Sequence, residues 1–197
     1  KHERGKLVLA FGTGKTYTSL RIAEDLLNQK GLILFLVPSI SLLGQTLNEW
    51  SFDARKPIKA VCICSDATAS RNRNANNDND DIQHTMVDLA APANTDPKMI
   101  SKRLRLFQKH DGLVVVFSTY QSIDAVYEAQ QQVLKDTDGQ FGKFDFIICD
   151  EAHRTTGARV KGQDDSDFSK IHKADYIQGA RRLYMTATPK VYSDSLK

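Results

Sequence analysis

Two short segments of the chain contain the residue types that hydrolysis of a nucleoside triphosphate requires. The first predicts a phosphate-binding loop, made by Gly12, Thr13, Gly14, Lys15 and Thr16. Glycines let backbone N–H groups face a phosphate, and a helix that follows such a loop directs its positive end there. The second segment is acidic, and it reads Asp150-Glu151-Ala152-His153.

The two segments supply complementary groups. Lys15 would neutralise the β and γ phosphates of ATP, and Glu151 would orient or deprotonate the attacking water. The Thr16 hydroxyl and the Asp150 carboxylate are hard oxygen ligands of the kind that Mg²⁺ prefers. The sequence therefore predicts ATP and Mg²⁺ as cofactors, with Lys15, Asp150 and Glu151 as catalytic residues.

Each segment alone is a weaker signal than the pair. The full loop pattern has a glycine five residues before Gly14, and this chain has Leu9 there. A glycine-rich turn can also be a plain helix entry, and the acidic segment could be a surface turn. Here the acidic segment follows the apolar run 144–149, which suits a buried parallel strand. Carboxylates at the carboxyl end of such a strand lie where open α/β sheets bind ligands.

The composition is that of an ordinary globular protein. Of its 197 residues, 41% are hydrophobic and 26% are charged, which suits one well-packed domain. The net charge of +3 is too small to predict a polyanion partner by itself. The longest apolar run, 32–37, is too short to span a bilayer, so we expect no membrane partner. Three cysteines without zinc-site spacing predict buried, reduced thiols and a reducing cytoplasm: Cys62, Cys64 and Cys149.

The elements that must position these groups alternate between strand and helix. This alternation predicts an α/β fold with a mostly parallel sheet and helices on both faces. We expect strands at 6–11, 31–37, 59–65, 113–118, 144–149 and 182–186. We expect helices at 15–29, over the apolar positions of 40–50, from the Asp96-Pro97 start, and over 123–134. Residues 66–81 are rich in Asn, Asp and Arg, and they predict a mobile insertion.

The ordered set of short motifs resembles the first RecA-like domain of superfamily 2 helicases and translocases. Residues 10–16 look like motif I, 37–46 like motif Ia, 117–122 like motif Ib, 150–153 like motif II and 185–189 like motif III. This superfamily often lacks the early glycine of the loop. The resemblance covers nearly the whole chain, and it implies a RecA-like P-loop domain over 1–197.

A closer resemblance is to the motor of bacterial restriction enzymes, above all those of type ISP. The segments GKLVLAFGTGKT, LFLVPSISLL, DEAHRT and RLYMTATPK are most similar to those enzymes. Arg154 follows the acidic segment where DEAH-box RNA helicases commonly have Glu, which favours the DNA translocase branch. The resemblance implies a bacterial, cytoplasmic enzyme whose partners are DNA, duplex or single-stranded, and the other domains of the same polypeptide.

The resemblance also implies roles beyond the ATP site. His153 would couple the nucleotide site to motif III through Thr186 and Thr188, although a buried histidine and strand-end capping are the plainer readings. Helix starts would meet the nucleic-acid backbone through Pro38, Ser39, Gln45, Ser118 and Thr119. Helix capping explains Ser39 or Ser118 equally simply.

The family's arginine finger comes from a second RecA-like domain, so we expect this chain to be a fragment of a larger enzyme. Arg154, Arg181 and Arg182 are the local candidates for such a finger. The leading hypothesis is an ATP-driven DNA translocase of a restriction system. An RNA helicase or a remodelling ATPase has the same chemistry. A P-loop kinase or ligase gives no reason for motifs Ia, Ib and III, and a non-hydrolysing scaffold gives none for Lys15 and Glu151.

Overall fold

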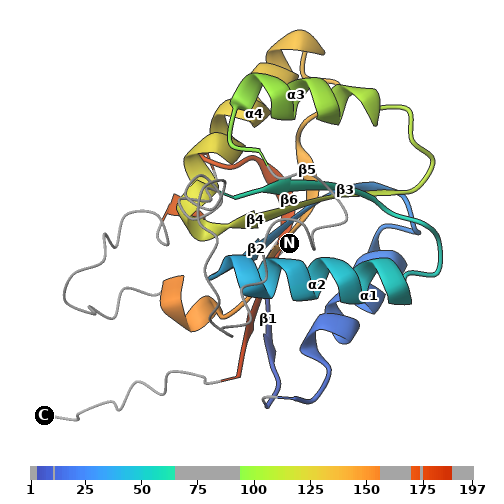
Figure 1. Ribbon diagram of the computed structural model, residues 1–197, viewed down its shortest axis with the longest axis vertical. Coiled ribbons are helices and arrows are strands. Elements are labelled where there is room, and N and C mark those ends of the chain that lie inside the picture. Colours follow the sequence, from blue (N-terminus) through green and yellow to red (C-terminus); the bar gives the residue numbers. More distant parts are fainter. Residues whose placement is uncertain (1–3, 11, 65–93, 156–169, 174, 188–197) are drawn as a thin grey trace, which may run out of the picture.

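The computed structural model shows a parallel sheet between two layers of helices (Figure 1). It describes residues 4–10, 12–64, 94–155, 170–173 and 175–187. The strands are β1 Arg4–Val8, β2 Gly31–Val37, β3 Lys59–Ile63, β4 Leu113–Thr119, β5 Phe144–Cys149 and β6 Gly179–Thr186. The helices are α1 Lys15–Leu26, α2 Ile40–Asp53, α3 Pro97–Leu106 and α4 Ile123–Asp136, with short 3₁₀ turns η2 Tyr120–Ser122 and η3 Ala152–Thr155.

Every strand pair is parallel, and the order is β1-β6-β5-β2-β4-β3. The predicted fold class is confirmed, and β6 lies between β1 and β5. Because parallel strands end at the same edge, the segments after β1, β5 and β6 meet at the carboxyl edge of the sheet. These are the segments that carry the predicted site.

Two apolar clusters hold the layers together. Helices α1 and α2 cover one face of the sheet, and α3 and α4 cover the other (Figure 1). The central strands β2 and β4 are buried almost throughout, as expected of a parallel sheet covered on both faces. On the face of α1 and α2, Trp50 packs edge-on against Phe35 and Phe117, with ring centroids 5.2 and 6.0 Å apart.

Several predicted boundaries differ from the structure. The first strand is Arg4–Val8 rather than 6–11, because pairing with β6 ends where Leu9 N donates to Thr186 O at 3.2 Å. Helix α1 ends at Leu26, not near Gln29. The chain turns through left-handed Asn28 and Gln29, with φ of 49° and 61°, and β2 then begins at Gly31 as predicted.

Some of the remaining predictions are confirmed, and one concerns residues that the structure does not describe. Asp96 caps α3, where its side chain accepts a hydrogen bond from Lys98 N, and Pro97 opens the helix as expected. The three cysteines are buried, as predicted. The expected insertion at 66–81 lies outside the described residues. No helix in the described part of the chain is long and apolar enough to cross a membrane.

Candidate active site

The loop between β1 and α1 is open above its glycines. Gly12 and Gly14 have φ of 76° and 80°, a left-handed conformation that favours glycine. Among the described residues other than the immediate chain neighbours, no heavy atom lies within 4 Å of where a Cβ on either glycine would stand. A hydrogen bond within the loop stabilises it: the Thr13 hydroxyl donates to Ala10 O at 2.7 Å. Leu9 stands where the full pattern has its early glycine, and Gly12 and Gly14 still adopt the left-handed conformation of such a loop.

The first turn of α1 is suited to bind an anion. Gly14 is the N-cap residue and provides no side-chain hydrogen bond to the helix. The N–H groups at the start of a helix have no partner within it and attract negative charge. Gly14, Lys15 and Thr16 therefore combine an open backbone, an ammonium and a hydroxyl at one place, which fits a polyphosphate chain.

The sheet brings the loop and the acidic segment together. Lys15 Nζ lies 3.6 Å from Glu151 Oε1, and the two side chains are only 11% and 18% exposed. These residues are 136 positions apart in the sequence, but β1 and β5 are separated only by β6. The Lys15 ammonium and the Glu151 carboxylate thus lie together in one partly buried space.

Asp150 is held at the end of β5 by backbone contacts. Its N–H donates to Leu36 O at 2.9 Å, and its Oδ1 accepts from Glu151 N at 2.9 Å. Burial raises the pKa of this carboxyl above its usual range and outweighs the opposing effect of the Glu151 N–H and of Lys15. A buried carboxylate with this tendency gains from a nearby divalent cation. Asp150 and the Thr16 hydroxyl are therefore chemically suited to Mg²⁺.

Glu151 has a left-handed backbone with φ of 48°. This conformation is uncommon for a residue with a side chain, and it recurs at functional sites. His153 Nδ1 lies 3.1 Å from Glu151 Oε2 and 3.1 Å from Thr186 Oγ1. Both contacts are satisfied when Nδ1 carries the proton and donates to the carboxylate and the hydroxyl oxygen. The structure thus brings His153 and Thr186 together; Thr188 lies outside the described residues.

Two aromatic residues that were not predicted as site residues also contact the site. The Trp50 indole N–H donates to Thr16 O at 3.2 Å, which ties α2 to the first turn of α1. The Tyr120 hydroxyl donates to Asp150 O at 2.8 Å, which ties the segment after β4 to the acidic segment. Both side chains are fully buried. A buried Trp or Tyr usually finds a partner for its polar atom, but no sequence pattern names that partner.

The predicted nucleic-acid contacts divide into exposed and buried side chains. Gln45 is exposed and donates to Glu49 Oε1 at 2.7 Å, and the partly exposed Ser39 caps α2 by accepting from Leu42 N at 3.3 Å. Pro38, Ser118 and Thr119 are buried. The hydroxyls of Ser118 and Thr119 bond to Thr119 O and to Ser122 Oγ. In this conformation, those two hydroxyls do not reach solvent, so they do not offer the contact that was expected of them.

Arg182, a local candidate for the arginine finger, does not lie at the candidate active site. It lies in the first half of β6, is 3% exposed, and donates through Nη2 to Ile177 O at 2.5 Å. Its guanidinium therefore supports the amino end of β6, away from Thr186 at the carboxyl end, and does not serve as a local arginine finger. Arg181 precedes it in the same half of the strand.

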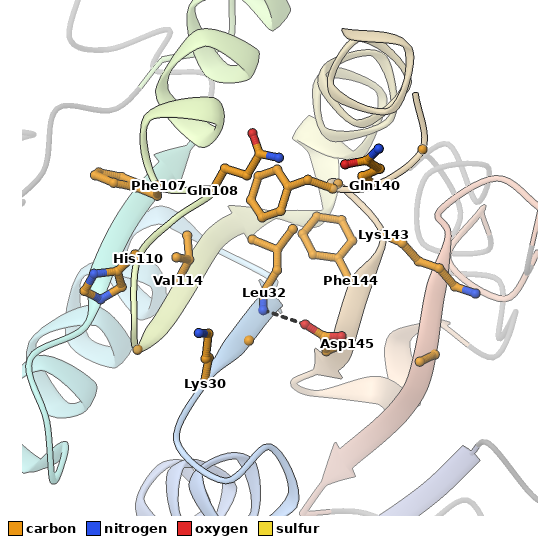
Figure 2. A pocket seen from close by; sticks show the side chains of 16 residues that line it. Lys30, Leu32, Phe107, Gln108, His110, Val114, Gln140, Lys143, Phe144 and Asp145 are labelled. Atoms are coloured by element: carbon orange, nitrogen blue, oxygen red, sulfur yellow. Dashed lines mark hydrogen bonds between the residues drawn. The ribbon is translucent and has the colours of Figure 1, made fainter. Parts of the chain in front are cut away.

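A pocket lies at the amino edge of the sheet, opposite the candidate active site (Figure 2). Its volume is about 500 Å³, and it is lined where β2, β4 and β5 begin. Asp145 accepts a hydrogen bond from Leu32 N at 2.8 Å at its edge (Figure 2). Because the candidate active site lies where these strands end, the pocket is separate from it.

Within the described residues, no group of three or more His, Cys, Asp and Glu side chains could hold a metal.

Comparison with known proteins gives a consistent set of similarities. A family model described as "Type III restriction enzyme, res subunit" matches residues 1–191. A structure of the type ISP restriction-modification enzyme LlaBIII bound to DNA is 39% identical, with a TM-score of 0.75, over 100% of this chain and 12% of that one. A nuclease-deletion mutant of the type ISP enzyme LlaGI, in complex with a DNA substrate mimic, is 39% identical, with a TM-score of 0.72, over 99% of this chain and 17% of that one.

More distant similarities agree. Probable helicase A859L of African swine fever virus (isolate Pig/Kenya/KEN-50/1950) is 28% identical over 95% of this chain, which spans 17% of that protein. The helicase domain of Pyrococcus furiosus Hef shares the fold, with a TM-score of 0.54 and 19% identity over 98% of this chain and 31% of that one. The chain therefore has the fold of a first RecA-like domain, and it spans about a sixth of the curated relatives it matches.

Proposed function

We propose that this chain is an ATPase motor domain that moves a larger enzyme along DNA. The chain belongs to the family described as type III restriction enzyme, res subunit. The observation that carries the proposal is the approach of Lys15 Nζ to Glu151 Oε1 at 3.6 Å. This contact joins a phosphate-binding loop to an acidic segment at one edge of a parallel sheet. Open α/β sheets bind their ligands at that edge.

The roles of the residues follow from their places. Backbone N–H groups of residues 12–16 bind the phosphates of ATP, and Lys15 offsets their negative charge. Thr16 and Asp150 would hold Mg²⁺, which stabilises charge on the phosphates when it is bound. Glu151 orients the attacking water and accepts its proton at a carboxylate oxygen. The negative charge that spreads over the γ-phosphate oxygens then remains to be stabilised by an arginine from another domain.

Movement requires that hydrolysis be transmitted to the nucleic-acid side. His153 Nδ1 contacts both Glu151 and Thr186, so a change at the water-handling carboxylate reaches the end of β6. Trp50 and Tyr120 connect the loop and the acidic segment to α2 and η2. Those elements begin at the segments that resemble motifs Ia and Ib. We infer that they carry nucleotide state to the DNA contact surface, where Ser39 and Gln45 are the accessible candidates.

DNA is favoured over RNA as the track. Two structural neighbours at 39% identity are described as bound to DNA or to a DNA substrate mimic. Because the chain covers only 12% and 17% of those proteins, the other domains would supply the second RecA-like half and any cleavage or modification chemistry. We place the whole enzyme in a bacterial cytoplasm, within a restriction-modification system.

The test is ATP hydrolysis by the full-length protein with duplex DNA, single-stranded DNA or RNA. We expect duplex DNA to stimulate turnover most, and Lys15→Ala to abolish the stimulated rate. Stimulation by RNA alone would instead identify an RNA helicase or a remodelling ATPase. ATP binding with no hydrolysis on any nucleic acid would identify a scaffold and contradict the proposal.

A further inference from the structure

Helix α3 presents a stripe of positive charge to solvent. Its sequence, PKMISKRLRL, contains two lysines and two arginines and no acidic residue. Lys98, Lys102 and Arg105 are exposed, and their spacing of four and three residues places them on one side of the helix. The four cations of α3 exceed the net charge of +3 of the whole chain. The excess positive charge of the chain is therefore concentrated on this helix.

The stripe is unfavourable for the helix by itself. Like charges three or four residues apart repel each other, and a cation in the first turn, such as Lys98, opposes the helix dipole. Arg105 Nη1 lies 3.1 Å from Asp136 Oδ2 of α4. Among the described residues, no carboxylate pairs with the ammonium of Lys98 or Lys102. An acidic partner would therefore relieve the repulsion at these two lysines.

A second pocket lies beside this stripe, between α3 and the edge strand β3 (Figure 1). Its volume is about 410 Å³, and the buried side chains of Val61 and Ile100 line it. Met99 and Leu106 line it too, although they are 52% and 74% exposed. Large apolar side chains that gather around a pocket at the surface mark an interaction site.

We propose that this surface of α3, formed by Lys98, Met99, Lys102, Leu106 and the adjoining pocket, binds an acidic amphipathic segment from another part of the enzyme. The Asp or Glu side chains of the segment pair with the two lysines, and its apolar side chains fill the pocket. The inference rests on the proposed function, which gives the enzyme further domains. In support of those domains, the chain covers only 12% and 17% of the two type ISP structures.

The pocket favours a protein segment over DNA as the partner. The phosphates of a nucleic acid would satisfy the lysines, but a sugar–phosphate backbone has no apolar side chain to bury Met99 and Leu106. A segment with acidic and apolar side chains satisfies both halves of the surface. The charges then fix its orientation, and burial of the apolar side chains supplies most of the affinity.

The place of the surface in the fold leaves the ATP site open. Strand β3 lies at one end of the strand order, whereas the candidate active site is built after β1, β5 and β6. A segment bound between α3 and β3 would therefore hold this domain against the rest of the enzyme without covering the phosphate-binding loop.

Carbodiimide cross-linking of the full-length protein tests what pairs with the lysines. The reagent joins a lysine amine to a carboxylate that contacts it, as an amide. Mass spectrometry should find Lys98 or Lys102 joined to an Asp or Glu outside residues 1–197, next to large apolar residues. A mixture of isotopically light and heavy protein shows whether the link lies within one molecule, as we expect.

The rate of lysine acetylation tests the role of the pocket. Bound lysines react with acetic anhydride only when the segment detaches, so Met99→Ser combined with Leu106→Ser should raise the acetylation rate of Lys98 and Lys102 by about tenfold. Phe52→Ser is the matched control, because it removes an apolar side chain that is 90% exposed on α2, and it should leave that rate unchanged. Thermal unfolding near the wild-type temperature would confirm that the variants are folded.

Several results would overturn the inference. Links only to residues within 1–197 would show that the chain covers its own surface, and links only between light and heavy copies would show self-association. No link outside the chain, with acetylation slowed by duplex DNA, would identify a DNA contact. Unchanged acetylation in the double variant would show that the pocket holds no segment. Failure of any nucleic acid to stimulate ATP hydrolysis by the wild type would instead contradict the proposed function.

Discussion

Replacing Glu151 by glutamine should separate ATP binding from ATP hydrolysis. The amide keeps the size of the side chain but does not accept a proton from water. If proton transfer limits the rate, hydrolysis should fall by about 10²–10⁴-fold. Lys15→Ala should behave differently, because Lys15 contacts phosphate charge in both the ground state and the transition state. That variant should lose binding and hydrolysis together.

The structure also predicts how ATP affinity changes in Glu151→Gln. Lys15 Nζ lies 3.6 Å from Glu151 Oε1, and this contact should compete with the phosphates for the ammonium. Coulomb's law gives about 4–5 kcal/mol for such a pair at an effective dielectric constant of about 20. Dehydration of the two ions offsets most of that energy and leaves about 1 kcal/mol. Removing the carboxylate charge should therefore tighten ATP binding, by up to about fivefold.

The assay pairs equilibrium binding of Mg·ATP with DNA-stimulated hydrolysis in the full-length protein. Glu128→Gln makes the same chemical change at an exposed position on α4, and it should match the wild type in both measurements. Full hydrolysis in Glu151→Gln would refute the role given to this carboxylate. A loss of ATP binding as large as that in Lys15→Ala would refute the competition between the carboxylate and the phosphates.

Three further predictions follow from the described contacts. Burial raises the pKa of Asp150, so its ionised form destabilises the fold at neutral pH, and this penalty is relieved as pH falls through the raised pKa. Asp150→Asn should therefore raise Tm at pH 7, and the gain in Tm should shrink in acid. The same variant should show weaker Mg²⁺-dependent ATP binding. Trp50 is the single tryptophan of the chain and donates to Thr16 O, so Mg·ADP should change the fluorescence intensity of the 197-residue chain, and should not do so in Lys15→Ala. The same isolated chain should hydrolyse ATP about 10³–10⁵-fold more slowly than the full-length enzyme on duplex DNA, because an arginine finger supplies that factor; comparable turnover would show that the chain completes its own site.

The sequence predicted the strands well because their signal is local. The run 32–37 is apolar throughout and 144–149 is apolar except for the exposed Asp145, a composition that suits burial on both faces of a parallel sheet. Boundaries were less accurate where pairing or backbone conformation decides them. Strand β6 begins at Gly179, three residues before the expected start, because it pairs with β5 from Phe144 onward. Arg181 and Arg182 make the first half of β6 polar, so hydrophobicity alone did not indicate a strand there.

The candidate site shows the same division. Lys15 and the acidic segment were recognisable because phosphate and Mg²⁺ chemistry demands particular residue types at fixed spacing. Contacts that depend on the packing of distant segments were not. Nothing local in the sequence states that Trp50 donates to Thr16 O, or that Ser118 is buried. Such facts follow from how α2 lies on the sheet and how β4 ends inside it.

The hydrogen bonds around the site explain how a domain with rigid central strands can respond to its nucleotide. Lys15 contacts the Glu151 carboxylate, and Glu151 also contacts His153. In the proposed mechanism, the phosphates would compete with Glu151 for Lys15, the carboxylate would then bind water, and the donor on His153 would shift toward Thr186. This exchange would need only side-chain movements. Strand β6 lies between β1 and β5 and ends at Thr186, so it would be the element through which the exchange reaches the rest of the enzyme.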